Sequence, residues 1–217
     1  MAALVPAWMA FACIAACCAG AACVPVERSR RLDNPAIGAR TIAQQVCSNC
    51  HGLDGNSVSP NFPRLAAQPQ PYLVAQLTGF RNHHRADPAG FEYMWGLSRH
   101  LTDEQIRGLA EYFSSQRPLS NSPGTPVLAA TGRDIFEHGI AEKQVPPCGS
   151  CHGDHGQGNA GFPRLATQHA DYVVKQLMVF QRTDERPEGA VMKTVAHLLS
   201  TDDMVAVAQY VQSMPAR

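Results

Sequence analysis

Apolar residues recur with helical spacing in two parts of the first half of the chain, residues 72–80 and residues 106–115. Side chains three or four positions apart share one face of a helix. The second stretch follows Thr102-Asp103-Glu104-Gln105, which has the form of a capping box. The side chains expected on the buried faces are Tyr72, Gln76, Leu77, Phe80, Ile106, Leu109, Ala110 and Phe113. With a shorter helix expected over residues 35–46, the pattern predicts short helices joined by loops.

The second half of the chain repeats this pattern. The segment Phe-Pro-Arg-Leu-Ala at 62–66 recurs at 162–166, and the helix face of residues 72–80 recurs in residues 172–180, both shifted by 100 residues. Tyr112 corresponds to Tyr210, a shift of 98, so the halves differ only by short insertions and deletions. We interpret this as a tandem duplication. It predicts a first domain over 35–117, a linker rich in Pro and Ser over 118–126, and a second domain over 127–217.

A pentapeptide of the form C-x-x-C-H occurs once in each half, as Cys47-Ser48-Asn49-Cys50-His51 and Cys148-Gly149-Ser150-Cys151-His152. This is the attachment signature of c-type haem, in which two thiols bind one porphyrin and the next histidine binds its iron. A structural zinc site would need two more ligands for each cysteine pair, and a redox dithiol would need no histidine. The motifs therefore predict two covalent haem c groups, attached through Cys47, Cys50, Cys148 and Cys151, with His51 and His152 as iron ligands.

The composition gives no sign of nucleic-acid binding or of disulfide bonds in the body of the protein. The 217 residues include 18 basic and 18 acidic side chains, so the polypeptide is formally neutral and has no basic stripe for a nucleic acid. Four of the eight cysteines belong to the motifs, and the other four lie before residue 24. No cysteine remains for a disulfide in the body of the protein. A domain of under a hundred residues buries little apolar surface and usually needs a cross-link or a bound group to be stable. Each haem is therefore expected to form much of its domain's core.

Residues 1–26 are expected to be a signal peptide or a membrane or lipid anchor. Residues 2–26 carry no charge, and Ala19-Gly20-Ala21 is a candidate cleavage site. Ile14-Ala15-Ala16-Cys17 resembles a lipobox, and the stretch is long enough to span a bilayer. Arginines follow the apolar run and none precedes it, which is unfavourable for export. We favour export to the periplasm, because covalent attachment of haem is expected outside the bacterial cytoplasm.

Met94 is the expected second axial ligand in the first domain, because no other methionine lies there. Met192 occupies the corresponding position in the second domain, at the 98-residue shift that also relates the last helices. The other methionines of the second domain fit a helix, the core or the chain end, and they are Met178, Met204 and Met214. Two alternatives stay open. Both methionines could fill the core, or one haem could have two histidine ligands, although no other histidine recurs in both halves.

Ligation by His51 and Met94, and by His152 and Met192, would leave no open position on either iron. Such an iron has no place for a substrate, and its ligands need not change between the ferric and ferrous states. A methionine ligand also raises the reduction potential relative to two histidines. These residues predict an electron carrier and not an enzyme, with no small-molecule substrate.

Both C-x-x-C-H motifs, the Pro-Arg-Leu-Ala segments, the Tyr/Gln/Phe helices and the methionine after each of them resemble those of cytochrome c4, a family of dihaem class I cytochromes c. The resemblance covers nearly all of the chain after residue 35. It implies an all-α fold of two tandem cytochrome c domains, packed about a pseudo-twofold axis with the haem propionate edges facing each other. It implies that the carbonyls of Pro63 and Pro163 bind the ligand histidines. Arg64 and Arg164 would either neutralise propionates or lie solvated on loops.

The resemblance also implies that electrons pass between the haems and that the partners are membrane respiratory complexes, notably terminal oxidases. The chain is therefore expected to be a periplasmic carrier of single electrons between such complexes. An electron-transfer subunit of a membrane dehydrogenase would use the same chemistry and stays open. A dihaem redox enzyme or a gas sensor would need an iron with a missing or displaceable ligand, which the paired methionines disfavour.

Overall fold

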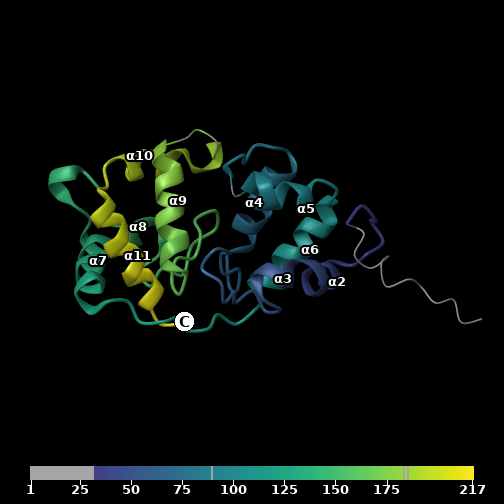
Figure 1. Ribbon diagram of the computed structural model, residues 1–217, viewed down its shortest axis with the longest axis horizontal. Helices are drawn as coiled ribbons and strands as arrows, with labels where there is room; N and C mark the ends of the chain where they lie inside the picture. The colour runs from purple at the N-terminus through teal and green to yellow at the C-terminus, as the bar shows by residue number, and fades with distance from the viewer. Residues whose placement is uncertain (1–31, 89, 183, 185) are drawn as a thin grey trace, which may run out of the picture.

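The protein is built from short helices, as Figure 1 shows. A computed structural model describes residues 32–88, 90–182, 184 and 186–217. Over these residues the β-structure is limited to two isolated bridges, Ile140 with Val145 and Asn159 with Phe162. The predicted all-α fold is confirmed. The expected leader, residues 1–26, lies outside the described residues, and none of the described helices has the length and apolar character needed to cross a bilayer.

The first domain begins with a continuous run of helix that ends at its C-x-x-C-H motif. Its elements are α2 (Ala39–Ile42), η2 (Ala43–Cys47), α3 (Ser48–His51), α4 (Gln70–Arg81), η3 (Gly90–Trp95), α5 (Gly96–Ser98) and α6 (Asp103–Ser114). The first helix was expected to start at Pro35 but starts at Ala39. The Asn34 side chain accepts a hydrogen bond from the Ala36 amide, at 3.0 Å, and Gly38 is extended. This local turn delays the helix.

The capping box predicted at Thr102 is present. The Thr102 hydroxyl accepts a hydrogen bond from the Gln105 amide at 3.1 Å, and the Gln105 side chain accepts one from the Thr102 amide at 3.0 Å. Helix α6 therefore starts at Asp103, three residues before the expected Ile106, and buries the expected apolar face. The Gln105 side chain also donates to the carbonyl oxygens of Asn34 and Ile37, at 3.0 and 3.1 Å. One residue thus begins the last helix and ties it to the first.

The second domain has the same order of helices with one difference before its motif. Its elements are α7 (Pro126–His138), η4 (Ala141–Lys143), α8 (Gly149–His152), α9 (Ala170–Arg182), η5 (Pro187–Gly189), α10 (Ala190–His197) and α11 (Thr201–Ser213). Helix α7 ends well before Cys148, and the Ile140–Val145 bridge spans the gap. Helix α7 also begins at Pro126, the last residue of the predicted linker, because proline is favoured in a first turn.

Each domain has its own apolar core. One cluster of buried residues gathers around Ile42, Ile106, Leu109 and Phe113, and the other around Phe136, Met204, Val207 and Val211. In Figure 1, α4 and α9 lie toward the middle of the molecule, whereas α2 and α7 lie toward its outer parts. The two domains therefore meet through α4, α9 and the loops on either side of them.

Replacing Gly132 with alanine should destabilise the second domain. Gly132 lies where α7 crosses α11, and a Cβ atom there would stand 2.0 Å from the Ala206 carbonyl oxygen. The helices would have to move apart, at a cost of about 1–3 kcal/mol. Gly96→Ala is the matched control, because nothing lies within 4 Å of its added Cβ. Denaturant unfolding followed by circular dichroism should show a loss for the first variant and none for the second; equal stability of both would contradict the packing argument.

Candidate functional site

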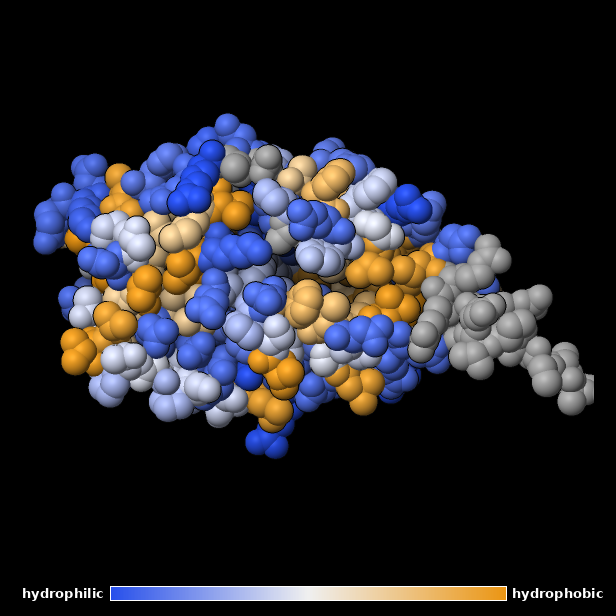
Figure 2. All heavy atoms as spheres, in the orientation of Figure 1, coloured by the Kyte–Doolittle hydropathy of each residue, from blue (hydrophilic) through white to orange (hydrophobic). Residues whose placement is uncertain are grey.

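A single large cavity extends through both domains and holds both C-x-x-C-H motifs on its wall. Its volume is about 1630 Å³, beyond the roughly 300–1,000 Å³ of an ordinary ligand pocket. Figure 2 shows the surface hollowed near the middle of the molecule, with hydrophobic side chains along the recess. The apolar lining includes Leu73, Phe80, Leu109, Phe113, Val173, Leu177, Phe180 and Val207. A cavity of this size and lining suits large flat apolar groups.

The four motif cysteines lie on this wall, and none of them forms a disulfide. Burial raises the pKa of Cys47 to about 12 and that of Cys148 to about 11. A redox dithiol works as a thiolate and lies where its pKa is lowered. The environment of these cysteines is the opposite, which speaks against the thioredoxin-like alternative.

The motif histidines are buried, and each makes one hydrogen bond to a proline carbonyl. His51 Nδ1 lies 2.9 Å from the Pro63 oxygen, and His152 Nδ1 lies 2.8 Å from the Pro163 oxygen. Because a carbonyl can only accept, Nδ1 carries the proton in each ring. Burial lowers the pKa of both histidines, so each ring is neutral and its Nε2 lone pair is available to a metal. These are the contacts that the family resemblance implied for Pro63 and Pro163.

The loop after each motif has to fold back to bring its proline over the histidine. The chain turns directly after the histidine at Gly52 and Gly153, whose φ angles of 80° and 83° suit glycine. Further along, the Leu65 amide donates to the Gly55 oxygen at 2.7 Å, and the second domain repeats this bond. The ring positions thus follow from the backbone of the loop.

Met94 and Met192 both line the cavity, from η3 and from α10. Gly90 and Gly189 precede them and pack against Phe80 and Phe180, where an added Cβ would lie 2.4 and 2.1 Å from the ring. The methionine follows this glycine by four positions in the first domain and by three in the second. The π-helical turn of η3 absorbs the extra residue, so both methionines reach the cavity wall.

The other candidate ligands are placed differently. Met204 and Met214 belong to the core of the second domain, but Met178 also lines the cavity. Position alone therefore does not select Met192; the repeat does, because Thr78 occupies the Met178 position in the first domain. Of the nine histidines, all of which are described, only His51 and His152 line the cavity. A second histidine ligand thus has no candidate on the wall.

Arg64 and Arg164 lie on the cavity wall, and some of their guanidinium N–H groups are buried without an acceptor. Nε of both residues and Nη2 of Arg164 are buried and have no hydrogen-bond partner in the described structure. Arg64 Nη1 donates to the Leu119 oxygen at 2.7 Å, and Arg164 Nη1 donates to the Arg217 oxygen at 2.9 Å. Burial lowers the pKa of both guanidinium groups. Buried N–H groups without acceptors are costly, so the wall suits a bound group that carries carboxylates.

Two glutamines exchange hydrogen bonds between the domains at these arginines. Gln68 of the first domain accepts from the Arg164 amide and donates to its carbonyl, both at 2.9 Å. Gln168 does the same for Arg64, at 2.9 and 3.0 Å. Each domain therefore holds the arginine loop of the other in position.

Sequence reasoning missed these glutamines, although the repeat contains the signal. Gln68 and Gln168 are 100 residues apart, and Arg85 and Arg186, buried at the domain boundary, are 101 apart. A recurring polar residue next to a recurring motif indicates a contact that both domains need.

One interdomain contact is not repeated. His169 of the second domain is buried against the first, with Nε2 donating to the Ser57 carbonyl oxygen at 2.9 Å. Its Nδ1 accepts from the Asn121 side chain at 3.3 Å. Burial lowers the pKa of His169, and the charge of Arg64 acts in the same direction, whereas the Ser57 bond and Asp171 oppose it. The folded protein therefore favours the neutral ring.

Comparisons with known proteins show which family the chain resembles. The family model for cytochrome c matches residues 36–117 and 129–215. The cytochrome c4 of Pseudomonas aeruginosa is 38% identical over 78% of this chain and 84% of its own. A thiosulfate dehydrogenase electron acceptor of Thiomonas intermedia is 32% identical over 78% of each chain. The crystal structure of reduced cytochrome c4 from Pseudomonas stutzeri covers 84% of this chain and 99% of its own, with a TM-score of 0.74 and 36% identity.

Replacing His169 with glutamine should reduce the loss of stability in weak acid. Below the ordinary histidine pKa of about 6.5, the unfolded chain binds a proton at this residue that the folded protein disfavours. Stability therefore falls as the pH falls through that value. The free energy of unfolding, measured at pH 7 and pH 5, should drop less in His169→Gln than in the native protein. His138→Gln, an exposed histidine of the same domain, should keep the native drop. An unchanged drop in His169→Gln would refute the assignment.

Proposed function

The chain belongs to the cytochrome c family, as one of its two-domain cytochromes c4, and on that basis we propose that it carries single electrons in the periplasm between membrane respiratory complexes and toward a terminal oxidase. It binds two haem c groups and is an electron carrier and not an enzyme. What remains to be proposed is which residues hold the haems and which complexes exchange electrons with them.

We assign the covalent attachment to Cys47 and Cys50 in the first domain and to Cys148 and Cys151 in the second. Haem supplies an iron that takes up and releases one electron. The observation that carries this assignment is the pair of neutral histidines, His51 and His152, each with its Nδ1 proton bound to a proline carbonyl at the wall of the shared cavity. That bond orients the ring and leaves Nε2 to the metal.

Met94 and Met192 are the proposed second axial ligands. Both line the cavity, and each follows a glycine that packs on Phe80 or Phe180, by four positions for Met94 and by three for Met192. With Met94 and Met192 bound to the haem irons, water and substrates would have no free position on the metal. This suits transfer of an electron without a change of ligands.

Arg64 and Arg164 are proposed to bind the haem propionates. Their buried N–H groups lack partners on the cavity wall, and the propionates are the only anionic part of a haem c. This favours the neutralising role over the solvated one, because both guanidinium groups are partly enclosed and Arg164 is buried. Propionates bound there would lie next to the domain boundary, since the backbone of each arginine is bound by the opposite domain.

A second candidate is an electron acceptor of a dehydrogenase. The observation that favours it is the similarity to the thiosulfate dehydrogenase electron acceptor of Thiomonas intermedia, which covers 78% of both chains. The chemistry within the protein would be the same, and the donor would differ.

Replacing Met192 with leucine should remove the proposed sulfur ligand from one of the two haem irons. The loss of the sulfur ligand should convert one haem to a high-spin or water-ligated form and halve the methionine-to-iron charge-transfer band of the oxidised protein. Met178→Leu is the matched control, because Met178 lies on the same cavity wall. It should leave the visible spectrum unchanged. If the Met178 variant loses the band and the Met192 variant keeps it, the ligand assignment is wrong.

Electron delivery tests the partners. The reduced, haem-loaded protein should be oxidised rapidly by a solubilised terminal oxidase, with oxygen uptake that saturates as the cytochrome concentration rises. Stopped-flow spectroscopy of the haem bands and an oxygen electrode measure the two quantities. Absence of oxygen uptake, together with rapid reduction of the oxidised protein by thiosulfate dehydrogenase and thiosulfate, would replace the first proposal with the second.

A further inference from the structure

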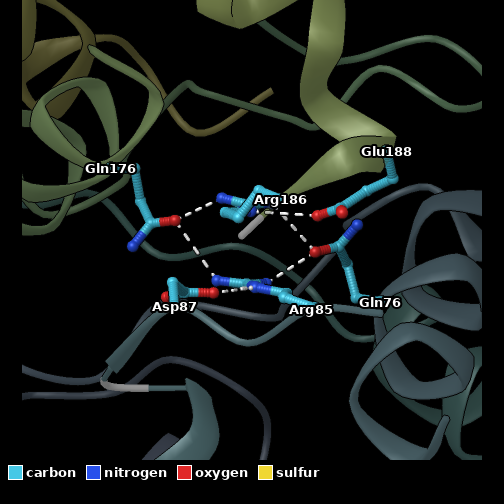
Figure 3. A network of polar contacts seen from close by, with 6 residues as sticks. All are labelled: Gln76, Arg85, Asp87, Gln176, Arg186 and Glu188. Carbon is cyan, nitrogen blue, oxygen red and sulfur yellow. Dashed lines mark hydrogen bonds and ion pairs between the residues drawn. The ribbon is translucent and has the colours of Figure 1, made fainter. Parts of the chain in front are cut away.

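Six polar side chains meet at the boundary between the two domains, as Figure 3 shows. Three come from each domain, and they are Gln76, Arg85, Asp87, Gln176, Arg186 and Glu188. All except Glu188 are buried. All six also line the cavity that holds the two motifs. This cluster therefore lies at the domain boundary and lines the same cavity as both haem motifs.

The two arginines share the same pair of acceptors. Arg85 donates from Nη1 to the Gln76 side-chain oxygen at 2.5 Å and from Nη2 to that of Gln176 at 3.2 Å. Arg186 donates from Nη2 to Gln76 at 3.0 Å and from Nη1 to Gln176. Each glutamine oxygen thus binds one guanidinium of its own domain and one of the other. The two arginines form a single unit that spans the boundary.

Each arginine is also fixed to its own domain. The Nε atoms of Arg85 and Arg186 donate to Asp87 and Glu188, at 2.8 and 2.9 Å. Their guanidinium carbons lie 4.4 and 4.5 Å from the ring centres of Phe80 and Phe180. These contacts orient both planar groups, so neither can turn independently.

Each guanidinium is paired with one carboxylate, Asp87 or Glu188, and has further N–H groups beyond the contacts above. Although burial opposes it, the neighbouring Tyr172, Asp87 and Tyr72 raise the pKa of Arg85. A guanidinium has five N–H groups, and the side-chain contacts above use three of them in each arginine. The others are not used in these contacts, and Tyr72 is a neighbouring polar group that interacts with Arg186.

We propose that Arg85 and Arg186 act together as a shared positioning element for electron transfer, which raises the reduction potentials of both haems as one unit. The proposal rests on the haem sites assigned above. Reduction adds a negative charge to a haem, and a nearby buried cation stabilises that charge. Because each arginine donates to one glutamine of each domain, its guanidinium lies at the boundary and its charge acts on both sites. The haem of each domain is therefore sensitive to the arginine of the other.

The test is the substitution Arg186→Gln in the haem-loaded protein, followed by potentiometric titration with visible spectroscopy. Both midpoint potentials should fall, including that of the first-domain haem. To assign the two haems, the titration is repeated in a Met94→His background, in which a histidine in place of methionine lowers the first-domain potential and separates the two waves. Arg85→Gln should give the same result and serves if Arg186→Gln does not fold.

Two controls separate charge from packing. Arg133→Gln removes an exposed charge of the same domain, where the guanidinium stacks on Tyr210, and should leave both potentials unchanged. Arg186→Lys keeps the charge but not the planar fork, and should move both potentials back toward the native values. Failure of lysine to restore them, although the methionine-to-iron band persists, would overturn the charge-based role.

The remaining outcomes are also decisive. A fall confined to the second-domain haem would show that the arginines act separately, and no fall in either would leave them a structural contact; both results overturn the proposal. A native protein that lacks two low-spin methionine-ligated haems would instead overturn the haem assignment, whatever the arginine variants do.

Discussion

The hydrogen bond from a buried histidine ring to a proline carbonyl is the contact on which each domain depends. It joins His51 to Pro63 and His152 to Pro163. Because the carbonyl can only accept, the bond sets the tautomer of the ring and leaves its other nitrogen free to bind a metal. To make it, the loop after the motif must fold back over the histidine. That same loop carries the next residue, an arginine, to the cavity wall at the domain boundary. The same loop therefore orients the histidine, lines the cavity and forms part of the contact between the domains.

The boundary between the domains contains buried arginines, and polar side chains surround them. Buried arginines would be unfavourable at an apolar interface, where nothing replaces the water that they lose. Here glutamine side chains bind the backbone of the arginine loops, and the boundary arginines share glutamine oxygens across the contact. A network of this kind fixes one relative orientation, since a shift of either domain would leave more buried donors unpaired. For an electron carrier with two haems, a fixed orientation keeps the distance between them constant.

Duplication kept these contacts while other parts of the two domains diverged. The π-helical η3 accommodates one extra residue before Met94, which leaves the cavity side of the helix unchanged. The Ile140–Val145 bridge lengthens the approach to the second motif without moving it from the wall. His169 bonds to Ser57 without a counterpart in the other direction. The departures from symmetry thus lie outside the paired histidine, proline and arginine positions, where the geometry tolerates little change.

The sequence by itself determined the elements, the duplication and the chemistry of the motifs, because these depend on spacing along the chain. Helical periodicity located α4 and α6, and the Thr102 capping box marked the start of α6 to within three residues. The repeat selected Met192 where cavity position alone would also admit Met178. Only the tertiary structure decided which side chains meet across the domain boundary. Arg85 and Arg186 are 101 residues apart, and nothing local distinguishes them from solvated arginines. Their role arises from the packing of two domains, which brings together groups that the chain keeps far apart.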